Sequence, residues 1–95
     1  MPYIRLSIMR ARPGEAERME EYMRKLAALA LEQEGCIESY TMKPHDDSGE
    51  IARLAIYRDE SAAEQSANSA AVMALRSEIH LLTEPGHIER AFFTI

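Results

Sequence analysis

Six polar side chains in this sequence are candidates for binding and activating an acidic organic substrate. They carry hydroxyl, guanidinium or imidazole groups and stand at Tyr40, Arg53, Tyr57, Ser66, Arg76 and His80. Arginine and tyrosine donors stabilise a developing phenolate or enolate, especially where water is excluded. Histidine is the side chain whose ordinary pKa suits a general base near neutral pH.

We therefore assign catalytic roles to Tyr57 and Arg76 as donors to an anion and to His80 as a general base. Tyr40, Arg53 and Ser66 are assigned to substrate binding at the edge of a pocket. The alternative for each of the six is a structural role, with the polar end hydrogen-bonded or in solvent at the periphery of the fold.

Motifs of other site classes are absent. The chain has no glycine-rich phosphate loop, no Cys-x-x-Cys pair, no Gly-x-Ser-x-Gly elbow and no His-Glu-x-x-His helix. His80, Glu84 and His87 lie close in sequence, but Pro85-Gly86 interrupts them, and a metal needs at least three converging ligands. We expect solvated histidines there rather than a metal site. Cys36 has no basic neighbour in sequence and is expected to be a small buried hydrophobe rather than a nucleophile.

Length and charge narrow the class of protein. Ninety-five residues predict a single domain, residues 1–95, with one modest core. A net charge of -5 argues against nucleic acid as a partner, because such proteins need a concentrated basic face. No apolar run approaches the ~20 residues that span a bilayer, so we expect no membrane partner. The single cysteine cannot form an internal disulfide, and the chain is predicted to be cytoplasmic.

Hydrophobic periodicity predicts the elements that must position these side chains. Period-two alternation and turn residues predict strands over Tyr3–Ala11, Cys36–Lys43, Ile51–Arg58 and Ile88–Ile95. One helix is predicted from Pro13-Gly14 to a left-handed stop at Gly35. A second is predicted to begin with a capping box at Ser61, with a possible restart at Ser69.

The second helical region is rich in small side chains, at Ala62, Ala63, Ala67, Ala70, Ala71 and Ala74. Such residues either let a helix approach the sheet closely or leave room beneath it, and the sequence does not decide between the two.

The order of elements predicts a ferredoxin-like α+β fold, β-α-β-β-α-β, with an antiparallel sheet and its helices on one face. Two helices leave the second face of the sheet uncovered. The strands are nevertheless apolar on both sides: Ile4, Leu6 and Ile8 alternate with Tyr3 and Met9. Strands apolar on both faces require cover on both. We therefore expect a homodimer, sheet against sheet.

Four stretches, in this order and spacing, resemble the antibiotic biosynthesis monooxygenase family over essentially the whole chain. They are Arg10-Ala11-Arg12-Pro13-Gly14, Glu34-Gly35-Cys36 leading to Tyr40, Ile56-Tyr57-Arg58-Asp59-Glu60-Ser61, and Ser66-Ala67-Asn68-Ser69 with Val72 to Leu75. The resemblance implies a dimeric α/β barrel. It also implies an activity such as oxygenation of polycyclic phenols, quinol oxidation or heme degradation, in several cases without a bound cofactor.

Departures from the family pattern refine this expectation. Tyr57 stands where members often carry Trp, Ala55 where they carry Glu, and Ser66 where His is frequent. The heme-degrading members resemble one another in an Asn, a Trp and an iron-binding His, and none of the three is retained here, where Ile4, Ser66 and Arg76 stand at the matching positions. Arginine does not serve as an axial iron ligand, so heme degradation is disfavoured.

The leading hypothesis is a monooxygenase without cofactor that oxidises an electron-rich aromatic or quinol substrate with dioxygen. One alternative is a non-catalytic dimeric module that binds a small hydrophobic ligand or a partner protein, because a fold does not determine its function. Another is an isomerase or cyclase on the same barrel, which would need an acid–base pair but no oxygen.

Overall fold

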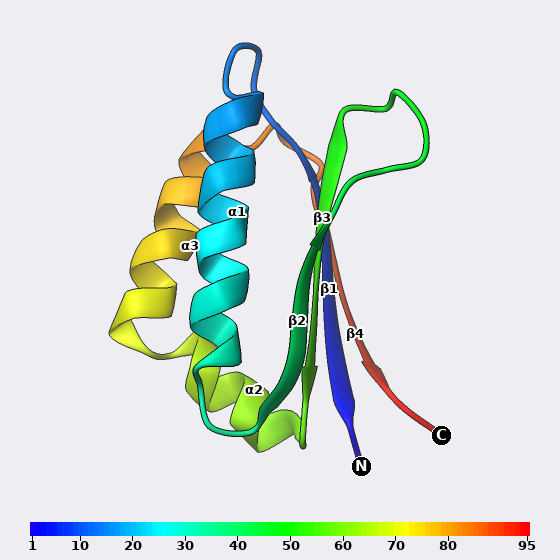
Figure 1. Cartoon of the computed structure of the whole chain (residues 1–95), viewed down its shortest axis with the longest axis vertical. Helices are drawn as coiled ribbons and strands as arrows, with labels where there is room; N and C mark the ends of the chain where they lie inside the picture. Colours follow the sequence, from blue (N-terminus) through cyan, green and yellow to red (C-terminus); the bar gives the residue numbers. More distant parts are fainter.

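The computed structural model describes residues 1–95 as a four-stranded sheet with three helices on one side (Figure 1). The elements are β1 (Tyr3–Arg10), α1 (Ala16–Leu31), β2 (Cys36–Met42), β3 (Glu50–Tyr57), α2 (Glu60–Ala67), α3 (Ala70–Leu82) and β4 (Ile88–Phe93). The strands lie in the order β2-β3-β1-β4, and every neighbouring pair is antiparallel. This confirms the predicted ferredoxin-like α+β fold.

Helix α1 forms because its apolar side chains recur on one face. Met19, Met23, Leu26, Ala27 and Ala30 are all buried, while the charged residues between them face solvent. The helix ends at Leu31, with Glu32 as its C-cap, so the predicted stop at Gly35 lies four residues too late. Gly35 has a φ of +83°, in the left-handed region, but it lies in the turn that leads into β2.

The second helical region is two helices rather than one. Asp59, not Ser61, begins α2: its side chain accepts a hydrogen bond from the backbone N–H of Ala62 at 2.9 Å. The predicted start at Ser61 was two residues late, because the Asp59 carboxylate, rather than the Ser61 hydroxyl, caps the first turn. The predicted restart is confirmed, since Ser69 caps α3 by accepting from the N–H of Val72 at 3.3 Å.

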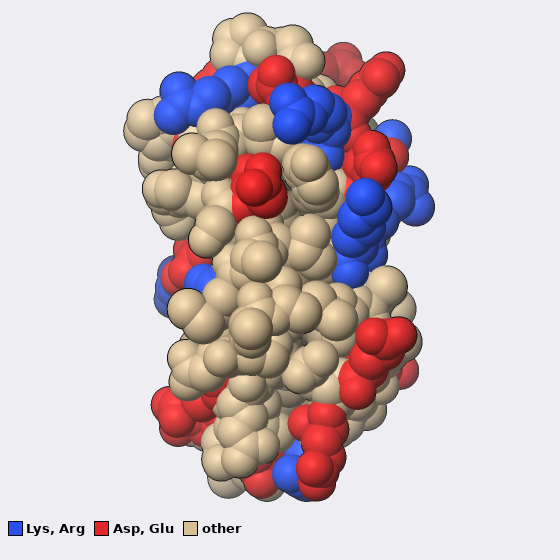
Figure 2. Space-filling model, turned by 90° about the vertical axis from the view of Figure 1, so that its left-hand side faces the viewer, with Lys and Arg blue, Asp and Glu red and all other residues tan.

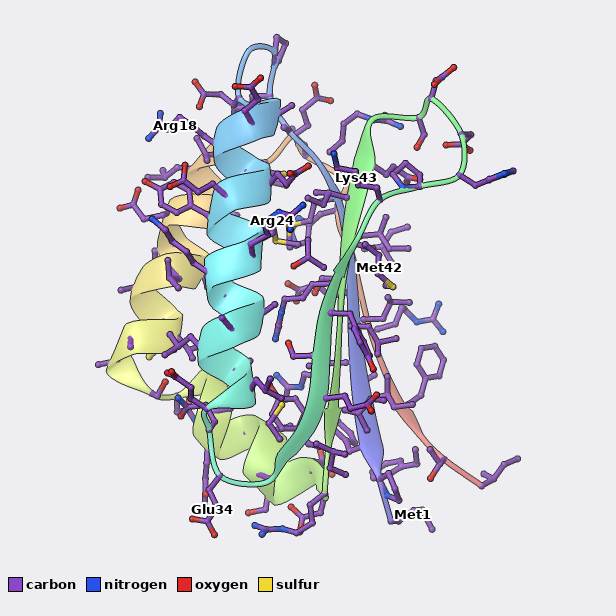
Figure 3. All side chains as sticks on the ribbon, viewed as in Figure 1. Met1, Arg18, Arg24, Glu34, Met42 and Lys43 are labelled. Carbon is purple, nitrogen blue, oxygen red and sulfur yellow. The ribbon has the colours of Figure 1, made fainter.

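The two faces of the sheet differ in chemistry. Tyr3, on the helix-covered face, is buried, and Arg5, Ser7 and Met9 follow it on that face and line the space beneath the helices. Side chains of the opposite face, Met42 among them, project away from the helices (Figure 3). This outer face carries the apolar residues Ile4, Leu6, Ile8, Tyr40, Met42, Ala52, Leu54, Ile56, Ile88 and Phe92, and the charged residues Arg10, Glu38, Glu50 and Arg90. The helices thus cover the more polar side of β1.

The core consists of two separate clusters. One joins α1 and α3 to the sheet through Met19, Met23, Leu26, Val72 and Ile79, together with Ile51 and Leu82. The other joins α2 to the sheet at its opposite end. Its members are Tyr3, Ala55, Tyr57, Ala62 and Ala63. The small residues Ala62 and Ala63 therefore bring α2 close to β3, whereas Ala67, at the end of the same helix, lines open space. Both consequences of small side chains occur within α2.

The outer surface of the helix layer carries few charges through its middle, with Lys, Arg, Asp and Glu gathered around its edges (Figure 2). Exposed small residues of α3, such as Ala70, Ala71 and Ala74, contribute to this surface. None of the three helices combines the length and apolar composition needed to cross a lipid bilayer.

Gly35 provides a test of how α2 approaches the sheet. A Cβ on Gly35 would lie 2.5 Å from Cβ of Ala62, whereas one on Gly14, at a φ of +80°, would meet nothing within 4 Å. We expect Gly14→Ala to lower the free energy of unfolding by about 1–2 kcal/mol, the backbone penalty alone. Gly35→Ala should lose about 1–3 kcal/mol more through overpacking. Urea denaturation measures both, and equal losses would show that α2 does not pack tightly against this turn.

Candidate active site

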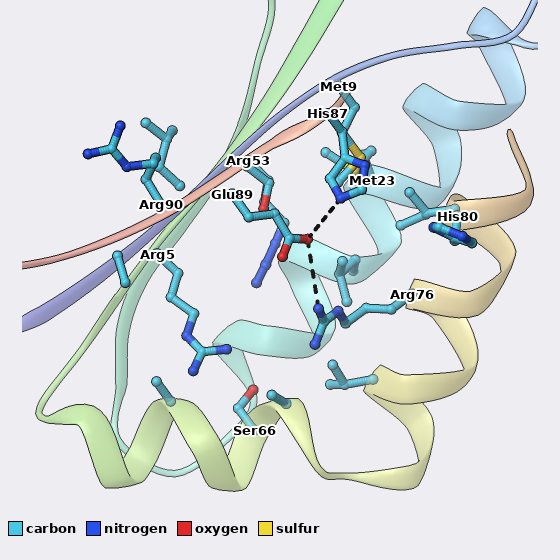
Figure 4. Close-up of a pocket in the computed structure, with 18 of the residues that line it drawn as sticks. Arg5, Met9, Met23, Arg53, Ser66, Arg76, His80, His87, Glu89 and Arg90 are labelled. Atoms are coloured by element: carbon cyan, nitrogen blue, oxygen red, sulfur yellow. Dashed lines mark ion pairs between the residues drawn. The ribbon is translucent and has the colours of Figure 1, made fainter. Parts of the chain in front are cut away.

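A cavity of about 560 Å³ lies between the sheet and helices α2 and α3 (Figure 4). Its apolar wall comes from Met23 and Leu26 of α1 and from Val72 and Ile79 of α3, all buried. The exposed side chains that line it come from the α3 side and from the β4 side, and they mark its opening. They are Met73, Arg76, Ser77, His80, His87, Glu89, Arg90 and Ala91.

The strand register arranges the floor of the cavity in rows. Ser7 is paired with Arg53 on one side and with Glu89 on the other, forming a polar row. In the next row, Arg5 stands between Ala55 and Ala91. An aromatic row follows, in which Tyr3 pairs with Tyr57 and Phe93. Polar and charged groups thus occupy the centre of the covered face, with the aromatic row at the end near α2.

Tyr57 and Ser66 form a buried pair at the aromatic end. Each is 2% exposed, and the Tyr57 hydroxyl donates to Oγ of Ser66 at 3.3 Å. Ser66 lines the cavity, and its own hydroxyl donates to no group of the protein. The structure brings together these two predicted residues as one hydrogen-bonding unit.

Arg76 and His80 lie one helical turn apart on α3, at the opening. The guanidinium of Arg76 lies 3.8 Å from Oε1 of Glu89, and Nε2 of His87 lies 3.9 Å from the same oxygen (Figure 4). The His80 and His87 rings meet edge to face at 6.3 Å. An imidazole and a guanidinium therefore flank the entrance to the cavity from α3, opposite a carboxylate from β4.

Arg53 lies on the floor of the cavity, and its Nε is buried without a hydrogen-bond partner. Its positive charge also acts on Cys36, at the start of β2. Burial raises the pKa of the Cys36 thiol above its ordinary value, and the nearby Arg53 guanidinium partly opposes this by favouring the thiolate. Cys36 is half-buried, and its Sγ lies 3.5 Å from the carbonyl oxygen of Glu38.

Tyr40 does not line the cavity. It lies on the outer face of the sheet, where its hydroxyl donates to the Glu38 carboxylate, and this interaction raises the pKa of the tyrosine. The register of β2 shifts between Cys36 and Glu38, and such a bulge reverses the side to which the following residues point. The geometry of the cavity gives no support to the predicted contact between Tyr40 and substrate.

The sequence analysis missed several polar residues that line the cavity, among them Arg5, Glu89 and His87. The alternation over Tyr3–Ala11 places Arg5 on the same face of the strand as Tyr3 and Met9. This pattern is the sequence signal that could have assigned Arg5 to the cavity. Glu84 lies outside the cavity, and no group of three or more His, Cys, Asp or Glu side chains is placed to hold a metal ion.

Comparison with known proteins identifies the family. A family model described as antibiotic biosynthesis monooxygenase matches residues 2–78. This range contains Arg5, Arg53, Tyr57, Ser66 and Arg76, and it ends before His80 and the β4 residues. No curated protein matches the sequence.

Several solved structures share the fold at low sequence identity. Rv0793 from Mycobacterium tuberculosis has a TM-score of 0.91 and 15% identity, covering 100% of this chain and 96% of that one. SnoaB, a cofactor-independent oxygenase from Streptomyces nogalater, has a TM-score of 0.86 and 13% identity, covering 99% and 93%. PA3566 from Pseudomonas aeruginosa has a TM-score of 0.85 and 21% identity, covering 99% and 94%.

The Cys36 thiol can report the position of the Arg53 charge. We expect alkylation by iodoacetamide to have a pH midpoint above the ordinary thiol value of about 8.5. In Arg53→Gln the midpoint should move further up, because the cation that favours the thiolate is gone. Arg12→Gln, which removes an exposed charge outside the cavity, should leave it unchanged. A midpoint that does not move in Arg53→Gln would place the guanidinium away from Cys36.

Proposed function

This chain belongs to the antibiotic biosynthesis monooxygenase family, and from that premise we propose that it is a cofactor-independent monooxygenase that oxidises an electron-rich aromatic or quinol substrate with dioxygen. The observation that carries the proposal is the cavity itself, where apolar walls enclose a buried hydroxyl pair and guanidinium groups. The likeness to SnoaB supports the same reading, because that protein is described as a cofactor-independent oxygenase.

The chemistry needs only a stabilised anion and dioxygen. A phenol or enol that loses its proton can give an electron to O₂, and the resulting radical and superoxide combine at a ring carbon as a peroxide. Loss of water then leaves a carbonyl, so that a CH₂ group and O₂ become C=O and H₂O. The substrate supplies all four electrons, and one oxygen atom enters the product. The protein must stabilise the anion, exclude water and hold both reactants together.

We assign these tasks to residues around the cavity. Ser66, polarised by Tyr57, donates to the developing anion from α2, and Arg76 stabilises its charge from α3. His80, at the opening, accepts the substrate proton and passes it to solvent. The buried side chains of Met23, Leu26 and Val72 hold the aromatic ring and keep water away from it. Arg53 contacts the substrate from the sheet.

Oxygen uptake by the metal-stripped protein tests this function against a panel of hydroquinones, anthrones and naphthols. We expect uptake above the protein-free rate that a chelator does not reduce. Arg76→Gln should lower the rate with the best substrate by about a hundredfold, the loss typical of one donor to a developing oxyanion. Tyr57→Phe removes the group that polarises Ser66 and should lower the rate by about tenfold. Tyr22→Phe should not change it, because that ring lies on α1 beside Arg18 and Lys25.

Full activity in both Tyr57→Phe and Arg76→Gln would contradict the residue assignment. Turnover that continues at the same rate without oxygen would replace the oxygenase with an isomerase or cyclase. Ligand binding without any turnover across the panel would favour the non-catalytic binding module.

We further propose that two copies of this chain pair through the outer face of the sheet. Tyr40, Ile88 and Phe92 on this face are each 44–45% exposed, and Leu6 and Leu54 lie paired between them on β1 and β3. A contiguous apolar patch across four strands is unusual on an isolated monomer. A second copy would cover it with an identical surface.

Light scattering on the eluting protein tests the pairing. We expect a mass of twice the 10.8 kDa of one chain at micromolar concentration. Phe92→Lys should give a folded monomer, because it places a charge in the apolar patch. Leu81→Lys makes the same change on α3, where the leucine is 67% exposed, and should remain dimeric. A wild-type monomer would contradict the pairing.

A further inference from the structure

Two arginines on the floor of the cavity have no carboxylate or hydrogen-bond partner in the protein. Arg5 on β1 and Arg53 on β3 are both half-buried, and neither forms an ion pair or a side-chain hydrogen bond. Ser7, two residues along from Arg5, pairs with Arg53, so the two arginines occupy diagonal positions on the same face of the sheet. Charges removed from water are normally paired, so this pair is suited to an anion that the protein itself does not supply.

The surroundings of Arg5 leave room for such an anion. Its neighbours across the sheet are Ala55 and Ala91, whose side chains end at a methyl group. Its guanidinium lies 5.7 Å from the centre of the Tyr3 ring. Figure 4 shows it pointing from β1 across the cavity towards α2, where Ser66 lies. The fork of Arg5 is therefore directed into open space.

The balance of charge in the cavity also favours an anion. The chain as a whole carries a net charge of -5. Facing the cavity, however, are Arg5, Arg53 and Arg76 against the single carboxylate of Glu89, which Arg76 already approaches at 3.8 Å. Arg90 is a separate case, because it pairs with Leu6 on the outer face of the sheet, and Figure 4 shows its side chain pointing away from the cavity.

From these observations we propose that the substrate carries a carboxylate besides its oxidisable ring, and that Arg5 and Arg53 together bind this carboxylate. Guanidinium forks match the two oxygens of a carboxylate and form short, charge-assisted hydrogen bonds with them. The claim that the protein oxidises the ring of this substrate rests on the function proposed above. The carboxylate site itself rests on the two arginines alone.

A carboxylate fits this site better than a phosphate. Phosphate sites draw on free backbone N–H groups, typically at a helix N-terminus or in a glycine-rich loop. Around Arg5 and Arg53 the backbone belongs to a central pair of paired strands. The N-terminus of α2 is capped by the Asp59 carboxylate, which repels an anion, and that of α3 by Ser69. Side-chain guanidinium groups are thus the donors that remain.

This placement agrees with the residue roles in the proposed reaction. A carboxylate on Arg5 and Arg53 would hold one end of the substrate on the sheet. The ring would then lie beneath α3 against Met23 and Val72, which line the same cavity. The surplus of two positive charges among these groups suits a substrate that carries one carboxylate and develops one phenolate.

Titration calorimetry without oxygen tests the carboxylate site independently of turnover. The probes are 2-naphthoate and 2-naphthamide, which have the same shape but differ in charge. We expect 2-naphthoate to bind at least about tenfold more tightly, the discrimination typical of a charge-assisted pair. Arg5→Gln and Arg53→Gln should each reduce its affinity to that of the amide, while Arg12→Gln should bind like the wild type. Arg53→Lys, which keeps the charge without the fork, should lie between.

Circular dichroism shows whether each variant is folded, and the comparison of the two probes on the wild type needs no variant. Equal binding of the two probes, or binding of neither at millimolar concentration, would overturn the proposal. Tighter binding of 2-naphthyl phosphate than of 2-naphthoate would overturn the choice of carboxylate.

Naphthoate binding without oxygen uptake on any substrate would refute the oxygenase and leave the carboxylate site standing. Oxygen uptake that is equally efficient for neutral and acidic substrates would overturn the carboxylate site and leave the oxygenase standing.

Discussion

The constraint on which this structure depends is the presence of two unpaired guanidinium groups on the covered face of its sheet. An apolar helix laid directly over Arg5 and Arg53 would strip them of water without supplying a counter-charge, at a large cost in free energy. The helices instead pack on either side of these two arginines. Helix α2 closes on the aromatic row through its alanines, and α3 packs against α1 through Val72 and Ile79. The cavity is the space that remains above the charged rows.

The same constraint gives the sheet an unusual distribution of side chains. Its covered face is polar at the centre, while the face away from the helices is apolar at the centre and carries Arg10, Glu38, Glu50 and Arg90 toward its edges. In a small α+β domain the helices would be expected on the apolar side. We propose that the polar side forms a site for a small molecule and that the apolar side pairs with a second copy of the chain. The family model shows family membership, and the solved neighbours, at low identity, establish the fold alone.

Local patterns in the sequence were sufficient for the fold but not for the site. Alternation and capping residues predicted all four strands, α1 and the restart at Ser69, since each depends on neighbours in the chain. Which face the helices cover was not predictable, because both faces of β1 contain apolar residues. Arg5 was missed because its position between two alanines depends on strand register. Tyr40 was misplaced because a bulge after Cys36 reverses the pattern of β2.

The most direct test of the central claim is a crystal structure of the protein with 1-hydroxy-2-naphthoate, grown without oxygen. The claim is that the unpaired arginines create and define a site for an acidic aromatic molecule. We predict the naphthalene ring beneath α3 and the carboxylate oxygens about 3 Å from the guanidinium nitrogens of Arg5 and Arg53. A cavity closed by α3, with both arginines turned to solvent or to protein carboxylates and the ligand bound elsewhere, would contradict it.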